Sequence, residues 1–150
     1  MGFPVNERAN EGLAYVGFVI APTLTTAQLT AAIDISKVRK VYAICQAATL
    51  GTSATVTFKA QGATTSGGSY TDIAGSSATL VKATDDNKSL ILDINAEAIN
   101  ALGLGYGFIK FSVSADVSSS VVVTAIGTCG REEPISGLVN LSSVKTTTVI

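Results

Sequence analysis

Two runs of β-branched and aromatic residues, separated by a short polar loop, limit this chain to a β fold more strongly than any other feature. The first run, 105–115, alternates apolar and polar residues with a period of two, which puts Ile109 and Phe111 on one face of a strand. The second run, 121–127, is apolar on both faces, so we expect it inside a sheet with cover on both sides. Together the runs predict a β-hairpin with its loop at 116–120.

Shorter runs with the same alternation recur along the rest of the chain. Pro22 is expected to end the first of them, and the segment 74–76 is expected to separate two of the later ones. One helix is predicted over 95–102, because Asn95 can cap its start and Gly103 can end it. The remaining strands are expected at 12–20, 31–36, 41–49, 53–61, 70–73, 77–82 and 89–94.

About eight short strands separated by turns are typical of an all-β sandwich. Parallel βαβ units would need repeated crossover helices, which this pattern lacks. Eight strands favour a jelly-roll-like β-sandwich. An immunoglobulin-like sandwich is the alternative, although it usually has a core tryptophan and this chain has none. We expect the β domain over 12–130, with extended arms at 1–11 and 131–150. The inward faces predict a core that contains Val56, Phe58, Leu90, Leu92, Ile109, Phe111 and Val113.

The chain has unusually little charge. Charged residues make up 14% of the sequence and the net charge is -1, so we expect neither nucleic acid nor a membrane surface as a partner. The apolar stretch 13–24 is too short to span a membrane. The basic cluster 37–40 is either a solvated turn or a patch that faces an acidic partner. So little charge suits a protein with close neighbours better than a freely diffusing enzyme.

The residue inventory argues against catalysis. The chain has no histidine, which removes the commonest general base and the usual nucleophile–histidine pairs. The available carboxylates share no motif and fall on expected turns and exposed strand positions. We therefore predict that this protein is not an enzyme and has no catalytic residues. The carboxylates considered are Asp34, Asp72, Asp93, Glu97 and Asp116.

No cofactor or metal site is predicted either. The segment 85–87 resembles a calcium loop in composition, but its spacing is not that of an EF-hand, and a turn, expected over 84–87, favours the same residues. The glycines of 103–107 precede no helix, so a phosphate loop is not expected. Cys45 and Cys129 both lie in apolar runs, which indicates two buried reduced thiols.

A family resemblance is carried by the turn and strand segments 58–61, 68–75, 85–88, 90–94 and 106–113. These segments resemble the capsid decoration (cement) proteins of tailed bacteriophages. The resemblance covers roughly 53–130 and departs from the pattern at Gly67, where that family often has an acidic residue. It implies a protein on the virion surface, made in the host cytoplasm, that forms a homotrimer and holds neighbouring major capsid proteins together.

Two other classes of function stay open at this point. A carbohydrate-binding β-sandwich could stack sugar rings on exposed aromatic side chains. Another phage part, such as a tail tube or a head fibre, would have similar strands.

The arms hold apolar residues without a strand period, so they cannot order on their own. We expect them to dock on a neighbouring subunit or on the capsid. The alternative is that the last stretch folds back as an edge strand of its own domain. The residues predicted to bind these partners are Phe3, Pro4, Arg131, Glu132, Glu133, Ile135, Leu138, Val139, Leu141 and Val144.

Overall fold

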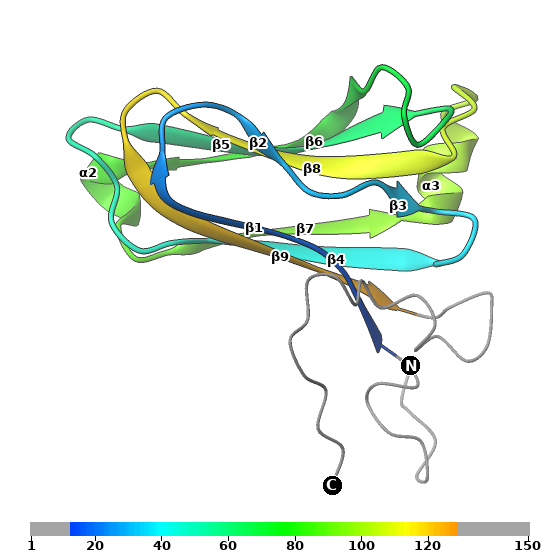
Figure 1. Cartoon of the computed structure of the whole chain (residues 1–150), viewed down its shortest axis with the longest axis horizontal. Helices are drawn as coiled ribbons and strands as arrows, with labels where there is room; N and C mark the ends of the chain where they lie inside the picture. Colours follow the sequence, from blue (N-terminus) through cyan, green and yellow to red (C-terminus); the bar gives the residue numbers. More distant parts are fainter. Residues whose placement is uncertain (1–12, 129–150) are drawn as a thin grey trace, which may run out of the picture.

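The computed structural model describes residues 13–128, which fold into two antiparallel sheets packed face to face (Figure 1). Sheet A has the strand order β1-β9-β4-β7, and sheet B has the order β2-β8-β5-β6, with β3 also paired to β8. The elements are β1 (Leu13–Leu24), β2 (Gln28–Leu29), β3 (Ile33–Asp34), β4 (Lys40–Ala47), β5 (Thr55–Ala63), β6 (Thr71–Val81), α2 (Lys82–Asp85), β7 (Ser89–Asn95), α3 (Ala96–Ala101), β8 (Phe108–Ala115) and β9 (Ser119–Thr128).

The connections between the strands give the sandwich its topology. Among the described strands, β5 and β6 alone are consecutive in the chain and hydrogen-bonded to each other. Most other connections cross from one sheet to the other, so the last strand, β9, lies between β1 and β4. This arrangement is a jelly roll. The fold class predicted from the sequence is therefore confirmed, and the immunoglobulin-like alternative is excluded.

The predicted hairpin of 105–127 is wrong. Its two runs do form strands, but β8 pairs with β5 and β2 in sheet B, whereas β9 pairs with β1 and β4 in sheet A. The short loop between them carries the chain across the core. Alternation shows which side chains point inward, but two strands with facing apolar sides can either lie side by side or stack across a core.

Pro22 does not end the first strand. β1 continues to Leu24, with an irregularity in its pairing between Ala21 and Leu24. A proline is tolerated there because β1 is an edge strand of sheet A and one row of its backbone groups has no partner strand.

Two other strands differ in length from the prediction. The expected strand 31–36 pairs as a strand only over β3. The two strands expected around 74–76 are one strand, β6, with a bulge in which residues 73–76 stand opposite Ala60. Gly75 takes up the distortion with a φ of 78°, a conformation that favours glycine.

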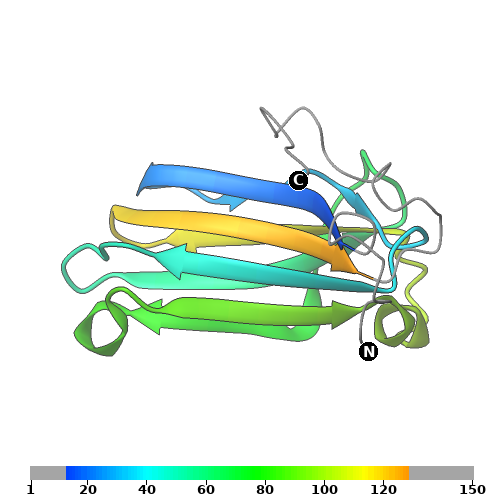
Figure 2. The same ribbon diagram turned by 90° about the horizontal axis from the view of Figure 1, so that it is seen from below.

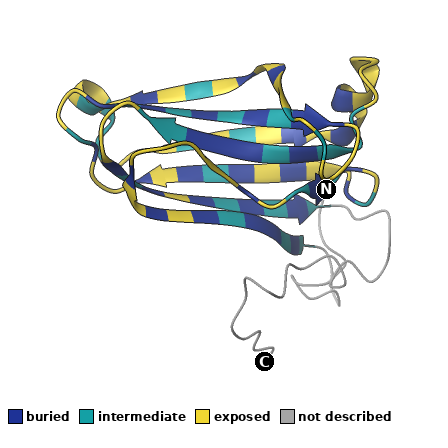
Figure 3. Cartoon of the chain, turned by 45° about the horizontal axis from the view of Figure 1, so that its top comes forward, coloured by how far each residue is buried: buried dark blue, intermediate teal, exposed yellow. Residues whose placement is uncertain are grey.

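The core lies between the sheets and combines large residues with small ones. The rings of Phe58 and Phe111, both on sheet B, stack with their centroids 5.7 Å apart. Sheet A faces them with small buried residues, including Ala43, Cys45 and Ala125. Dark-blue buried residues alternate with lighter ones along the strands in Figure 3. Small residues facing large ones let the sheets pack at interior density.

Most of the predicted core is buried. Leu90 and Leu92 are the exceptions, since they are only partly buried at the margin of the core. Their strand, β7, is the other edge of sheet A, where cover from neighbouring strands is incomplete. The predicted residues that are fully enclosed are Val56, Phe58, Ile109, Phe111 and Val113.

The two short helices lie at the two ends of β7 (Figure 2). The predicted helix is confirmed as α3, which Asn95 caps by accepting a hydrogen bond from the Glu97 N–H at 2.9 Å. Gly103, with a φ of 69°, follows its end. The sequence predicts a turn at 84–87. The structure has the short helix α2 there, which begins two residues earlier, at Lys82. Within 13–128, no helix has the length and apolar character needed to cross a membrane.

Candidate interaction surface

The partner-binding residues predicted from the sequence lie outside the described residues. The structure nevertheless places the two ends of the described chain, from which the segments 1–12 and 129–150 continue. Leu13, at the start of β1, pairs with Thr128, at the end of β9. The two ends of the described chain, Leu13 and Thr128, therefore lie side by side at one end of sheet A (Figure 1). The residues concerned are Phe3, Pro4, Arg131, Glu132, Glu133, Ile135, Leu138, Val139, Leu141 and Val144.

The carboxylates considered for catalysis are spread over different elements and hold local structure. Asp34 accepts hydrogen bonds from the backbone N–H and the hydroxyl of Ser36, at 2.9 and 2.6 Å. Asp116 accepts one from the Thr55 N–H at 2.7 Å. Asp93 and Glu97 lie on β7 and α3. Across 13–128, no group of three or more His, Cys, Asp or Glu side chains is arranged to hold a metal ion.

The acidic turn after β6 is tied to the fold. Asp86 pairs with Lys82 and accepts a hydrogen bond from the Leu50 N–H at 3.0 Å. These two contacts, the Lys82 bond foremost, lower the pKa of Asp86. Asp85 accepts a hydrogen bond from the Val81 N–H at 3.0 Å, which is the main reason that the pKa of Asp85 is also lowered. The carboxylate oxygens of Asp85 and Asp86 thus accept hydrogen bonds from within the protein.

These pKa shifts predict weaker folding in acid. Because the folded pKa of Asp86 lies below the unfolded value of about 3.9, its contribution is present above that pH and is lost as the pH falls through the folded value. We expect the urea midpoint to fall between about pH 5 and pH 3. An Asp86→Asn variant should start with a lower midpoint and show a shallower fall. If the urea midpoint falls by the same amount in the two proteins over this pH range, Asp86 contributes nothing to acid sensitivity.

Cys45 is buried in the core, as predicted. Burial raises the pKa of the Cys45 thiol to about 12, so it stays protonated and inert at neutral pH. Cys129 lies outside the described residues.

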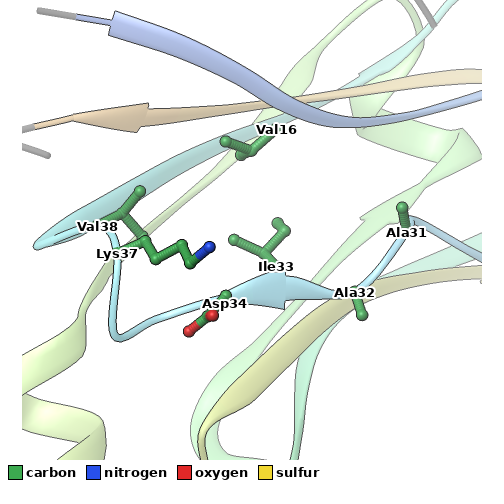
Figure 4. Close-up of a pocket in the computed structure, with 7 residues that line it drawn as sticks. All are labelled: Val16, Ala31, Ala32, Ile33, Asp34, Lys37 and Val38. Carbon is green, nitrogen blue, oxygen red and sulfur yellow. The ribbon is translucent and has the colours of Figure 1, made fainter. Parts of the chain in front are cut away.

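An open pocket of about 220 Å³ lies between β1 and the segment around β3 (Figure 4). Apolar side chains of Val16, Ile33 and Val38 form much of its wall. The charged groups beside it are those of Asp34 and Lys37. A small-molecule site usually combines an apolar cavity with several convergent polar groups, and this pocket has too few of them to indicate a ligand class.

A second open pocket, of about 330 Å³, lies where the edges of the two sheets meet. It is lined by the bulge of β6, by β7 and by α3, including Gly75, Ile91 and Leu102. Its lining is mostly aliphatic, with Ser76, Asp93 and Asn95 as the polar members. Two of these are already engaged within the protein, because Ser76 donates to the Ala60 and Ile73 carbonyls and Asn95 caps α3.

The basic cluster 37–40 is not a uniformly solvated turn. Val38 is only 1% exposed, whereas Arg39 and Lys40 are exposed. The solvated-turn interpretation therefore fits Arg39, whereas Lys40 is the first residue of β4. The acidic-partner interpretation stays a prediction.

The largest unexplained feature is the outer face of sheet A, shown in front in Figure 2. The strand register places its outward side chains in rows that cross β1, β9, β4 and β7 in order. The row at one end of the sheet consists of Leu13, Thr128, Lys40 and Asn95, and three further rows follow it. We call the aromatic and aliphatic side chains of these three rows the apolar face. The three rows are Tyr15, Ile126, Tyr42 and Asp93; then Phe18, Thr124, Ile44 and Ile91; then Ile20, Val122, Gln46 and Ser89.

The side chains of the apolar face contact one another and are still open to solvent. Ile20 is 66% exposed and Ile91 is 51% exposed, at opposite edges of the sheet. The rings of Tyr15 and Phe18 stack with centroids 6.3 Å apart. Partial burial raises the pKa of Tyr15, against the opposing effect of its hydrogen bond with Thr124. A contiguous exposed surface of this kind marks an interaction site.

The outer face of sheet B has the opposite character. Asp72 accepts hydrogen bonds from Lys59 at 2.7 Å and from Gln61 at 2.6 Å. These bonds, the one from Lys59 first, lower the pKa of Asp72. The ammonium of Lys110 lies 4.3 Å from the ring centroid of Tyr70. This face satisfies its own polar groups and suits contact with water, so the two faces of the sandwich have different roles.

Sequence reasoning missed the apolar face, although one signal for it was visible. The run 121–127 is apolar on both sides, and cover on both sides was expected for it. The inner side, with Val121 and Val123, is indeed buried in the core. On the outer side, Val122 is exposed and Ile126 is half-buried. Within the described residues, nothing supplies the second cover.

No protein-family model matches this chain, and no curated protein is similar enough in sequence to count as a relative. The resemblance to capsid decoration proteins stays a prediction. The topology, the position of the chain ends and the apolar face are the structural facts from which a function can be inferred.

Proposed function

We propose that this chain is a non-enzymatic structural protein of a phage particle. It binds the outer surface of the capsid, stabilises contacts between major capsid protein subunits, and assembles as a homo-oligomer, with a trimer expected. The two arms reach the neighbouring capsid subunits, and the jelly roll is the rigid body from which they extend.

The observation that supports this proposal most is the pairing of Leu13 with Thr128. It puts the bases of both arms at one end of one sheet, so that a stiff body can be held on a surface by two segments at once. Linking two contacts in this way raises the overall affinity well above that of either contact. The segment after Thr128 supplies apolar residues suited to such contacts, among them Leu138 and Leu141.

The body itself fits a structural role. Jelly rolls occur in viral capsid proteins, in lectin domains and in cupins, so the fold alone does not decide among them. The carboxylates weighed for catalysis include Asp34, Asp72 and Asp116, and these three hold turns and strands in place through hydrogen bonds. A role in assembly needs no reactive group, which is consistent with these uses.

The test is electron cryomicroscopy of particles of the phage that encodes this chain, assembled with and without it. We expect additional density on the outer capsid surface, between major capsid subunits, only when the chain is present. Purified chain added back to the deficient particles should restore this density and raise the temperature at which they lose their DNA. Density within the tail tube or on a head fibre would contradict the capsid role.

A truncated chain serves as the matched comparison. Deleting 136–150 should leave the melting temperature of the isolated protein unchanged but abolish binding to the particles. If the deletion unfolds the isolated protein, the last stretch belongs to the core and the docking role of the arm is wrong. Binding of the intact chain to immobilised glycans, without binding to particles, would favour the carbohydrate-binding alternative.

A further inference from the structure

We propose that the apolar face packs against a neighbouring copy of this chain and is the surface through which its homo-oligomer forms. The inference deepens the proposed function, since it rests on the self-assembly proposed there and names the surface responsible. It does not depend on the capsid as partner.

The first argument is the composition of the face. Aromatic and β-branched side chains fill the centre of the first two rows, and the centre of the third holds Val122 beside the uncharged Gln46. The charged groups, Asp93 and Lys40, lie together at one end. Interfaces between copies of one chain are more apolar than other interfaces, and their centres are depleted of charge. A face with an uncharged centre also meets its own copy without like-charge repulsion.

The same composition argues against other occupants. Nucleic acid and anionic lipid are bound by clustered Lys and Arg side chains. The outward rows of sheet A contain one basic side chain, that of Lys40, and it lies at one end of the face. A sugar needs polar groups around the stacking ring. The polar side chains Asp93, Gln46 and Ser89 lie on β4 and β7, two or three strands away from the stacked rings of Tyr15 and Phe18 on β1.

The second argument is size. Neighbouring strands lie about 4.8 Å apart and residues about 3.4 Å apart along a strand. Sheet A has the strand order β1-β9-β4-β7, and β4 has 8 residues, so the outer face covers roughly 19 by 27 Å at these spacings. With an equal area of a neighbouring copy packed against it, this face would bury on the order of 1,000 Å² in total, the size at which specific interfaces begin.

The third argument is the demand for cover on strand β9. Val121 and Val123 face the core, while Val122 and Ile126 face outward from the same central strand. A strand that is apolar on both sides is normal where a sheet is buried on both faces. A neighbouring copy provides the missing layer.

The test is sedimentation velocity of the full chain over a wide concentration range, with charged substitutions on each sheet. Ile20→Lys and Val122→Lys put like charges on the apolar face at exposed positions. Thr79→Lys is the matched control, because Thr79 is exposed on the outer row of sheet B. We expect a homo-oligomer that each face variant weakens at least tenfold and that Thr79→Lys leaves unchanged. A monomer at all concentrations, or an oligomer insensitive to both face variants, would overturn the proposal.

Tyrosine footprinting distinguishes a neighbouring copy from the chain's own segments. Tyr15 and Tyr42 lie on the apolar face, whereas Tyr70 and Tyr106 lie elsewhere and serve as internal controls. Hydroxyl-radical modification of the first pair should rise several-fold on dilution, while that of the second pair stays constant. Protection of the first pair that does not change on dilution would mean that the chain covers its own face, and the proposal would be wrong.

The two proposals fail separately. Suppose that Val122→Lys abolishes the oligomer, but the intact chain does not bind to particles. The capsid role would then be rejected and the interface between copies would be retained. If the chain binds to particles as an oligomer that neither Ile20→Lys nor Val122→Lys affects, the capsid role would be retained and the interface through the apolar face would be rejected.

Discussion

Replacing Phe111 with alanine is expected to lower the free energy of unfolding by about 3–5 kcal/mol, the usual cost of truncating a buried aromatic residue. Phe111 is 1% exposed and stacks on Phe58 at 5.7 Å between the sheets. The cavity left behind could not close easily, because its strand, β8, is hydrogen-bonded on both sides, to β5 and to β2. Urea unfolding measures the loss. All variants should be compared at one protein concentration, since self-association would add to the apparent stability.

Phe108→Ala is the matched control, because Phe108 belongs to the same strand but points to the opposite side and is only half-buried. We expect a clearly smaller loss for it. A loss below about 1 kcal/mol for Phe111→Ala, far under the usual range for a buried aromatic, would show that the inward face of β8 is assigned wrongly.

The strands that the sequence predicted best are those with one buried and one solvated face. In β5, Val56 and Phe58 are buried while Thr57 and Lys59 are not. Here period-two alternation follows directly from the physics of a half-buried strand. The helix α3 was predictable for a related reason, since capping by Asn95 is a local interaction.

The pairing of strands was not predictable in the same way. Strand β9 pairs with β1 and β4, which lie far away in the sequence, and its loop to β8 resembles that of a hairpin. Local patterns contain no information about partners at that distance. Pro22 and the bulge at Gly75 show the same limit, because edge position and bulges depend on the assembled sheet.

The candidate surface was predictable only in part. The sequence indicated that 121–127 needs cover on both sides, and the structure provides it on one. The remaining rows of the apolar face could not be inferred, because Tyr15, Ile126 and Tyr42 become neighbours only through the strand order of sheet A. The partner-binding residues predicted in the arms lie outside 13–128, so that prediction stays open.

The second large effect is expected for Gly51→Ala, at the loop between β4 and β5. A Cβ atom at this position would lie 2.4 Å from the carbonyl oxygen of Ser118 and 2.8 Å from a methyl group of Val117. The backbone at Gly51 or at Ser118 must therefore shift to make room for the methyl group. It cannot do so freely, because the Gly51 N–H donates to the hydroxyl of Ser119 at 3.1 Å and the Ala54 N–H donates to the Gly51 carbonyl at 2.9 Å.

We expect Gly51→Ala to destabilise the fold by about 1–3 kcal/mol, as overpacking of a tight site does. Gly67→Ala is the control, since a Cβ there meets nothing within 4 Å and the φ of Gly67 is not positive. That variant should be neutral or stabilised by up to about 1 kcal/mol, because alanine restricts the unfolded chain. The two substitutions add the same methyl group, so opposite signs in urea unfolding would identify the contact with Ser118 as the cause. Equal stability of the two variants would mean that the loops can separate at no cost, contrary to the close approach of Gly51 and Ser118.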